Sequence, residues 1–117
     1  MQLCHEQHAN GRLFVFEHPA GAASWMMKAI QQMRQLEGVH VVKFDFCMLG
    51  MLTSDRAGNP GAAKKRTTLM TNSPAVAMLL REAQCRSEHQ HIPLLGGRAG
   101  PCQEYPDQFC ELICEVI

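Results

Sequence analysis

The sequence predicts one partial domain of the α/β class over residues 1–117, and three observations support this class. Short apolar runs bounded by Gly, Pro and Asn indicate about three strands. A segment with helical spacing of apolar residues separates the first two runs, which is the order of a parallel strand, helix, strand crossover. An irregular segment rich in His, Cys and Gly precedes a C-terminal amphipathic helix. A chain of 117 residues has room for a single core.

The first predicted strand ends on a carboxylate. The apolar run Leu13–Phe16 is followed directly by Glu17, His18 and Pro19. Pro19 cannot donate a backbone hydrogen bond to a neighbouring strand and favours extended backbone at His18, so the strand is expected to stop there. Glu17 is therefore interpreted as a carboxylate held rigidly at a strand end, as base recognition or proton transfer requires. A salt-bridged or helix-capping surface carboxylate is the alternative interpretation.

A helix and a second strand are predicted after this run. The helix is indicated by apolar residues at three-to-four spacing, namely Trp25, Ala29, Ile30, Met33 and Leu36. It is expected to have about three to four turns and to end at Gly38. Val39–Met48 predicts the strand, because its phenylalanines alternate with polar residues.

The segment from Leu49 to Arg66 is predicted as a flexible polar loop. It ends in the three basic residues Lys64, Lys65 and Arg66. Thr67–Thr71 is a β-prone run that is expected to return beside the second strand as an antiparallel partner. In that arrangement the basic residues lie at the loop end of the sheet, where they could contact a phosphate. The alternative is a solvated run that keeps an edge strand soluble.

Three further helices are predicted. Residues up to His8 form the last turns of one helix, which stops at Asn10-Gly11. Ser73 and Pro74 are the expected N-cap and first residue of another. The final helix opens after Pro106. Its core-facing stripe consists of Phe109, Leu112, Ile113 and Val116.

A candidate metal site lies in the irregular segment between the last two helices. It consists of two thiols and two imidazoles, Cys85, His89, His91 and Cys102. Thiolates and imidazoles are good zinc ligands. The spacing matches no common zinc finger, so the alternative is a polar loop whose His side chains hydrogen-bond to the backbone. The glycine-rich residues 96–100 are expected to form a flexible connection rather than a phosphate cradle.

Composition and charge exclude several classes of protein. Eleven basic residues balance eleven acidic ones, so no overall field draws the chain to nucleic acid or to an anionic membrane. No apolar run is long enough to span a bilayer, and residues 1–8 lack the features of a signal peptide. Six cysteines without an export signal favour reduced thiols in an intracellular protein, cytoplasmic or nuclear, over a disulfide scaffold.

Several short motifs occur in an order that resembles one family. From the N-terminus they are Phe16-Glu17-His18-Pro19, Asp45-x-Cys47-Met48-x-Gly50, Lys65-x-Thr67, Met70-Thr71-Asn72-Ser73, Cys85-x3-His89-x-His91 and Tyr105-Pro106. Together they resemble the C-terminal part of a cytosine-C5 DNA methyltransferase-like domain, of the divergent kind found in phages and in retroelement-type polyproteins. The resemblance implies a partial Rossmann-like sheet of the class I methyltransferase type, with S-adenosylmethionine as the cofactor of full-length relatives and DNA as a partner.

The resemblance assigns a role to Glu17. It implies that this carboxylate binds a flipped cytosine through N3 and the exocyclic amine, with His18 in place of the family's usual Asn. Carboxylates accept hydrogen bonds from the cytosine amine, and enzymes that modify a base take it out of the stack. Lys64, Lys65 and Arg66 stand near the place of the family's arginine-bearing motif and are the expected substrate-binding cations.

The chain departs from the family before Phe14, where the glycine-rich cofactor loop and the Pro-Cys nucleophile motif would stand and neither is present. We therefore expect a fragment that is inactive alone and does not bind S-adenosylmethionine. Its expected partners are the missing N-terminal part of the domain and further copies that associate through an exposed sheet edge.

Two alternative functions stay open, as does the question of whether the chain is an enzyme. One is a small zinc-stabilised interaction module of a mobile-element polyprotein, built on Cys85, His89, His91 and Cys102. The other is a nucleic-acid-binding remnant that uses the basic residues 64–66 and Arg98.

Overall fold

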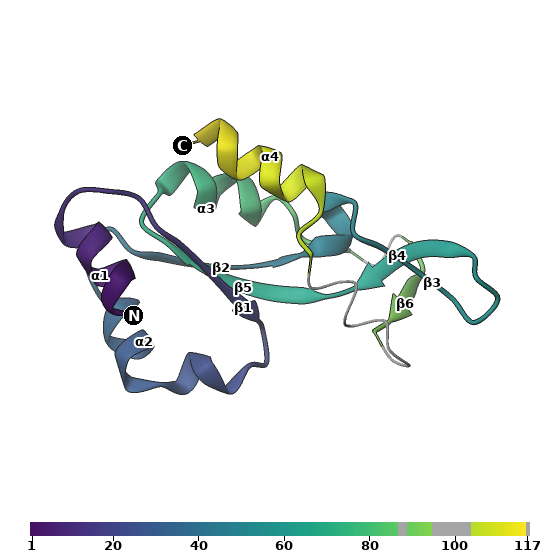
Figure 1. Cartoon of the computed structure of the whole chain (residues 1–117), viewed down its shortest axis with the longest axis horizontal. Coiled ribbons are helices and arrows are strands. Elements are labelled where there is room, and N and C mark those ends of the chain that lie inside the picture. The colour runs from purple at the N-terminus through teal and green to yellow at the C-terminus, as the bar shows by residue number, and fades with distance from the viewer. Residues whose placement is uncertain (87–88, 95–103, 117) are drawn as a thin grey trace.

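The strands of the computed structural model form two three-stranded sheets (Figure 1). The structure describes residues 1–86, 89–94 and 104–116. Sheet A has the antiparallel order β1 (Val15–Pro19), β5 (Arg66–Thr71) and β2 (His40–Asp45). Sheet B has the order β3 (Leu52–Ser54), β4 (Pro60–Lys64) and β6 (His91–Pro93), with β3 antiparallel and β6 parallel to β4. Only Lys65 separates β4 from β5, so the central strand of sheet B continues almost directly into the central strand of sheet A.

The central strand of sheet A is β5, as the burial of Thr67–Thr71 requires. The predicted antiparallel pairing with the second strand is confirmed, with Asp45 opposite Arg66 and His40 opposite Thr71. β1 and β2 run in the same direction, but β5 lies between them. The mixed α/β class is confirmed. A Rossmann-like arrangement is not confirmed, because both pairs of neighbouring strands in sheet A are antiparallel.

Sheet B corrects the prediction of a flexible loop over residues 49–66, because β3 and β4 form a hairpin there. Its tip is ordered by Asp55, whose Oδ1 accepts hydrogen bonds of 2.9 Å from the N–H groups of Ala57 and Asn59. Gly58 adopts φ 84° in the same turn. Strands this short and polar lack the apolar alternation by which a strand is predicted from sequence. The sequence therefore predicts the turn but not the two strands that flank it. β6 likewise lies in the segment predicted as irregular.

The predicted helix after β1 is shorter than expected and is interrupted. η1 (Ala23–Met26) is a 3₁₀ turn and α2 (Lys28–Met33) is an α-helix, with Met27 extended between them at ψ 138°. The buried Trp25 accounts for the break. Its Nε1–H donates to the carbonyl of Pro19 at 3.1 Å, and its own carbonyl accepts from Gln31 Nε2 at 2.6 Å. This carbonyl is thereby satisfied by a side chain instead of a helical N–H group.

The remaining helices begin and end as capping chemistry predicts. α1 (Gln2–Ala9) ends at Asn10-Gly11. α3 (Pro74–Arg81) follows Ser73, whose hydroxyl accepts from the Val76 N–H at 3.2 Å. α4 (Asp107–Val116) buries Phe109 in the core. None of the described helices has the length and hydrophobicity needed to cross a bilayer.

Helices cover both faces of sheet A, with α3 and α4 on one face and α1 and α2 on the other (Figure 1). Adjacent side chains of β5 are therefore buried in different hydrophobic cores, because successive side chains of a strand point to opposite faces. Leu69 belongs to the core beneath α3 and α4, and Met70 belongs to the core around Trp25.

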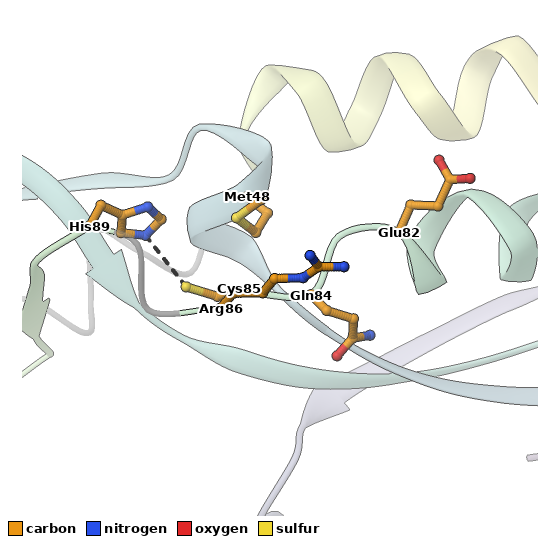
Figure 2. A pocket seen from close by; sticks show the side chains of 6 residues that line it. All are labelled: Met48, Glu82, Gln84, Cys85, Arg86 and His89. Carbon is orange, nitrogen blue, oxygen red and sulfur yellow. Dashed lines mark hydrogen bonds between the residues drawn. The ribbon is translucent and has the colours of Figure 1, made fainter.

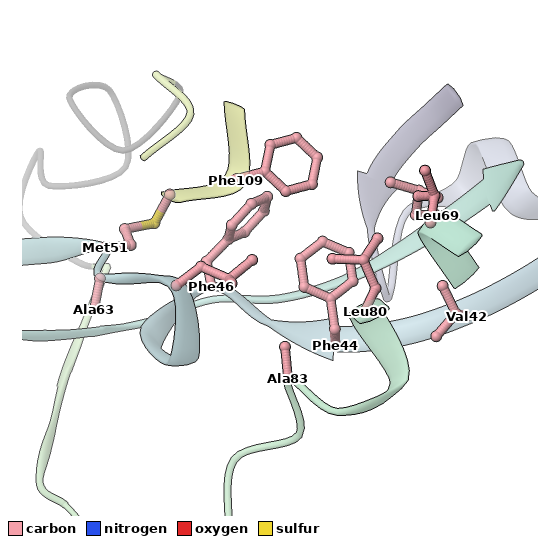
Figure 3. Close-up of a cluster of buried hydrophobic side chains, with 11 residues drawn as sticks. Val42, Phe44, Phe46, Met51, Ala63, Leu69, Leu80, Ala83 and Phe109 are labelled. Atoms are coloured by element: carbon pink, nitrogen blue, oxygen red, sulfur yellow. The ribbon is translucent and has the colours of Figure 1, made fainter. Parts of the chain in front are cut away.

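The core beneath α3 and α4 extends beyond sheet A to the start of sheet B. Figure 3 shows Phe44, Phe46 and Phe109 side by side, with Met51 and Ala63 next to them. The ring centroids of Phe46 and Phe109 lie 5.3 Å apart, and Phe46 is fully buried. Because Phe46 directly precedes Cys47, this aromatic cluster fixes the segment that carries the candidate site.

Candidate metal centre

Four potential metal ligands converge at the junction of the two sheets. They are Cys47, Cys85, His89 and His91, whose ligand atoms all lie within 4.8 Å of one another. Cys47 lies in the 3₁₀ turn η2 (Phe46–Leu49) directly after β2, and Cys85 lies beyond the end of α3. His91 begins β6, which pairs with β4. Three separate parts of the chain therefore supply the four ligand atoms.

The spacing of the ligand atoms fits a tetrahedral zinc ion. His91 Nε2 lies 3.3 Å from the Sγ atoms of both Cys47 and Cys85, and 3.0 Å from His89 Nε2. Cys85 Sγ lies 3.6 Å from His89 Nε2. Zinc bonds of about 2.3 Å to sulfur and about 2.0 Å to nitrogen place tetrahedral ligand atoms roughly 3.3–3.8 Å apart. Two thiols and two imidazoles at these separations could hold a metal ion with small adjustments.

Asp45 anchors the Cys85 segment to sheet A. Its buried carboxylate accepts from the Cys85 N–H at 2.8 Å through Oδ2 and forms an ion pair with Arg66 at 3.1 Å. Its backbone N–H donates to the carbonyl of Ala83 at 2.9 Å. The Gln84 side chain adds a further hydrogen bond to the carbonyl of Lys43. Cys85 is therefore held in position by its protein neighbours.

The turn that carries Cys47 is equally well defined. The N–H of the buried Phe46 donates to the carbonyl of Lys65 at 3.0 Å, and Gly50 ends the turn in the left-handed conformation at φ 81°. Burial, followed by hydrogen bonding to Cys85 and the charges of Cys85 and Asp45, raises the pKa of the Cys47 thiol to about 12. Without a metal this thiol is protonated at neutral pH, so a bound cation would have to displace its proton.

One side of the centre faces solvent. A pocket of about 270 Å³ lies against Cys85 and His89 and is also lined by Met48, Glu82, Gln84 and Arg86 (Figure 2). His89 is exposed, whereas Cys47, Cys85 and His91 are half-buried. The His89 imidazole therefore closes the centre on its solvent side.

The structure brings together three of the four ligands that the sequence predicts. Cys85, His89 and His91 are close in space, and Cys102 lies outside the described residues. Sequence reasoning missed Cys47, because it was assigned to a strand that was expected to continue to Met48. β2 instead ends at Asp45. The available signal was Gly50, a residue typical of a turn shortly after the cysteine.

Glu17 and His18 point to opposite faces of β1 and so do not share a site. Glu17 accepts a hydrogen bond from the Thr67 hydroxyl and lines a pocket beside α4. The His18 ring stacks on Phe16 with centroids 4.7 Å apart, and its Nδ1 lies 2.8 Å from the Ser24 hydroxyl. His18 thus takes part in local packing at the start of η1.

The three basic residues at the junction of the sheets each have different surroundings. Lys64 is exposed at the end of β4, and the Nζ of Lys65 lies 5.3 Å from the centre of the Phe46 ring. Arg66 binds Asp45 and also donates to Gln84 Oε1 at 3.2 Å. Arg66 therefore supports the segment that carries Cys85, while Arg98 lies outside the described residues.

The chain matches no family model, no curated protein and no solved structure.

Proposed function

We propose that this chain is a small module whose fold is completed by one structural zinc ion bound to Cys47, Cys85, His89 and His91. The proposal rests on the convergence of these four ligand atoms within 4.8 Å. Two thiolates and two imidazoles are the ligands of many structural zinc sites, which have four protein ligands and no open position. Zinc would join η2, the segment after α3, and β6. It would thereby secure a strand that, within the described part of the chain, pairs only over His91–Pro93.

The proposed zinc is expected to contribute to folding rather than to chemistry. The free energy of binding a structural zinc ion is also folding free energy, because the site does not exist in the unfolded chain. A reducing compartment keeps such thiols from forming disulfides, so the proposal is compatible with the intracellular location expected from the sequence.

The first prediction is that the purified chain contains about one zinc ion and is less stable without it. Chelation is expected to lower the melting temperature by at least about 10 °C. The measurements are elemental analysis and thermal unfolding, with native protein and with the variants Cys47→Ser and Cys85→Ser. Both variants should lose zinc. Cys114→Ser is the matched control, because Cys114 is an exposed thiol on α4 outside the cluster.

The variant Cys102→Ser distinguishes the ligand predicted from the sequence, Cys102, from the ligand proposed from the structure, Cys47. Full zinc content in this variant, together with loss in Cys47→Ser, supports the four ligands proposed. A metal-free protein whose melting temperature is unchanged by chelator would rule out a structural zinc.

The methyltransferase-like fragment stays a second proposal. The parallel directions of β1 and β2, with a helical connection between them, favour it, as does the position of Glu17 at the wall of a pocket. In this proposal the sheet is the end of a Rossmann-like domain, Glu17 recognises cytosine, and the cofactor binds elsewhere in a longer protein. The chain alone should then show no binding of S-adenosylmethionine by calorimetry. Clear micromolar binding would show that the cofactor site does not need the missing motifs.

A further inference from the structure

A second site lies on the opposite side of sheet A from Trp25, between β1 and α4. It is a pocket of about 340 Å³. Its lining residues are Val15, Glu17, Tyr105, Phe109, Cys110, Ile113 and Cys114. Pockets of a few hundred Å³ with apolar walls and a few polar groups are typical of small-ligand sites.

Among the residues that the structure describes, Glu17 is the one acidic residue that lines this pocket, and no basic residue lines it. The ion pair recorded within the described residues joins Arg66 to Asp45, so Glu17 has no basic partner there. The carboxylate is half-buried and accepts from the Thr67 hydroxyl through Oε2. Because a carboxylate offers about four acceptor positions, it can bind further donors from a ligand.

Tyr105 places an aromatic ring next to this carboxylate. Burial, and after it the charge and hydrogen bonding of Glu17, raises the pKa of the Tyr105 hydroxyl. The Tyr105 ring lies against Phe109 with centroids 5.0 Å apart, so two aromatic side chains line the pocket that Glu17 also lines. A negative charge next to aromatic and aliphatic walls is complementary to a cation that also has an apolar body.

We propose that this pocket binds a small organic cation with a planar amidinium or guanidinium group. Such a group donates two parallel hydrogen bonds to a carboxylate and stacks on aromatic rings. It is also more weakly hydrated than an ammonium group, so it enters an apolar pocket at lower cost. The planar group would contact Glu17, and the apolar body would lie along Val15 and Ile113.

The test uses benzamidine as the probe and the full chain as purified. Tyr105 is the only tyrosine of the chain, so its ring resonances in NMR report binding at this pocket. Benzamidine should shift them in a saturable way. The neutral benzamide and the ammonium compound benzylamine should each bind at least about tenfold more weakly, a difference of about 1.4 kcal/mol.

Glu17→Gln should weaken benzamidine binding by at least about tenfold. Glu111→Gln is the control, because it removes the same charge from an exposed position on α4 that does not line the pocket. Equal effects of the two variants, or equal binding of benzamidine and benzamide to the native chain, would overturn the proposal. The comparison of the three probes needs no variant and therefore remains decisive if Glu17→Gln does not fold. Equal binding of benzylamine would overturn the preference for a planar cation.

Discussion

Asp45 has several structural roles at the residue scale. Its carboxylate accepts from the Cys85 N–H and pairs with Arg66, while its N–H bonds to Ala83. Hydrogen-bonded groups around metal ligands hold these ligands in position for the metal. Asp45 connects β2 to the segment after α3, together with the hydrogen bond from Gln84 to Lys43, and it lies only two positions from Cys47.

Asp45→Asn is therefore expected to weaken zinc binding by about 10-fold to 100-fold, because supporting contacts of a metal site typically have effects of this size. The measurement is competition for zinc with a chromophoric chelator. Asp55→Asn makes the same chemical change at the tip of the β3–β4 hairpin and should leave zinc affinity unchanged. A native affinity in Asp45→Asn would show that the Cys85 segment is positioned without this carboxylate.

At the scale of elements, the turn η2 determines where Cys47 lies. Gly50 ends this turn at φ 81°, a conformation that costs a residue with a Cβ atom about 1–2 kcal/mol. A Cβ atom at Gly50 would also come within 2.6 Å of the Gln108 side chain on α4. The contacted Gln108 atom is the far end of a flexible, exposed side chain that can move aside, so the left-handed backbone is the main cost of a larger residue at this position.

Gly50→Ala is expected to lower the free energy of unfolding by about 1–3 kcal/mol and to weaken zinc binding, because the turn would shift. Gly21→Ala is the matched control, since its Cβ would meet no atom within 4 Å and its backbone is not left-handed. Urea unfolding of both variants in zinc-loaded form tests this prediction. Equal stability of Gly50→Ala and the native chain would contradict it.

Some helices and strands could be predicted from the sequence and others could not. Ser73 and Pro74 mark the start of α3 correctly, because capping depends on neighbouring residues alone. The break at Met27 could not be predicted, because it depends on contacts of Trp25 with Pro19 and Gln31. Sheet B is likewise defined by pairing between distant segments, and its strands are too short to show a pattern of their own.

In the candidate site, too, the ligands that lie close together in sequence could be predicted and the distant one could not. The spacing of Cys85, His89 and His91 predicted that they bind one metal ion, since residues close in sequence are also close in space. Cys47 comes from a segment almost forty residues earlier, and only the pairing of β4 with β6 and the contacts of Asp45 bring it there. Long-range packing, which a single sequence does not reveal, therefore decides the fourth ligand.

At the scale of the whole molecule, sheet A and sheet B differ in how they are supported. Sheet A has helices on both faces and two hydrophobic cores. Strand β6 of sheet B pairs with β4 over three residues and carries His91, one of the four proposed zinc ligands. Zinc should therefore stabilise sheet B more than sheet A.

Hydrogen exchange is expected to show this difference. Removal of zinc should accelerate exchange of the amides in β4 and β6 before those of β5, because stability is not uniform across a structure. Exchange at Ala63, which is fully buried in β4, compared with Leu69 in β5 provides matched reporters. Equal acceleration in both strands would mean that the chain unfolds as one unit when zinc leaves.

The coordination of the bound metal tests the proposed zinc centre most directly. X-ray absorption spectroscopy of the zinc-loaded chain should show two sulfur ligands at about 2.3 Å and two nitrogen ligands at about 2.0 Å. This result would match Cys47, Cys85, His89 and His91. A shell with three sulfur ligands would place another cysteine at the metal, and a shell composed mainly of oxygen would contradict a structural zinc at this position.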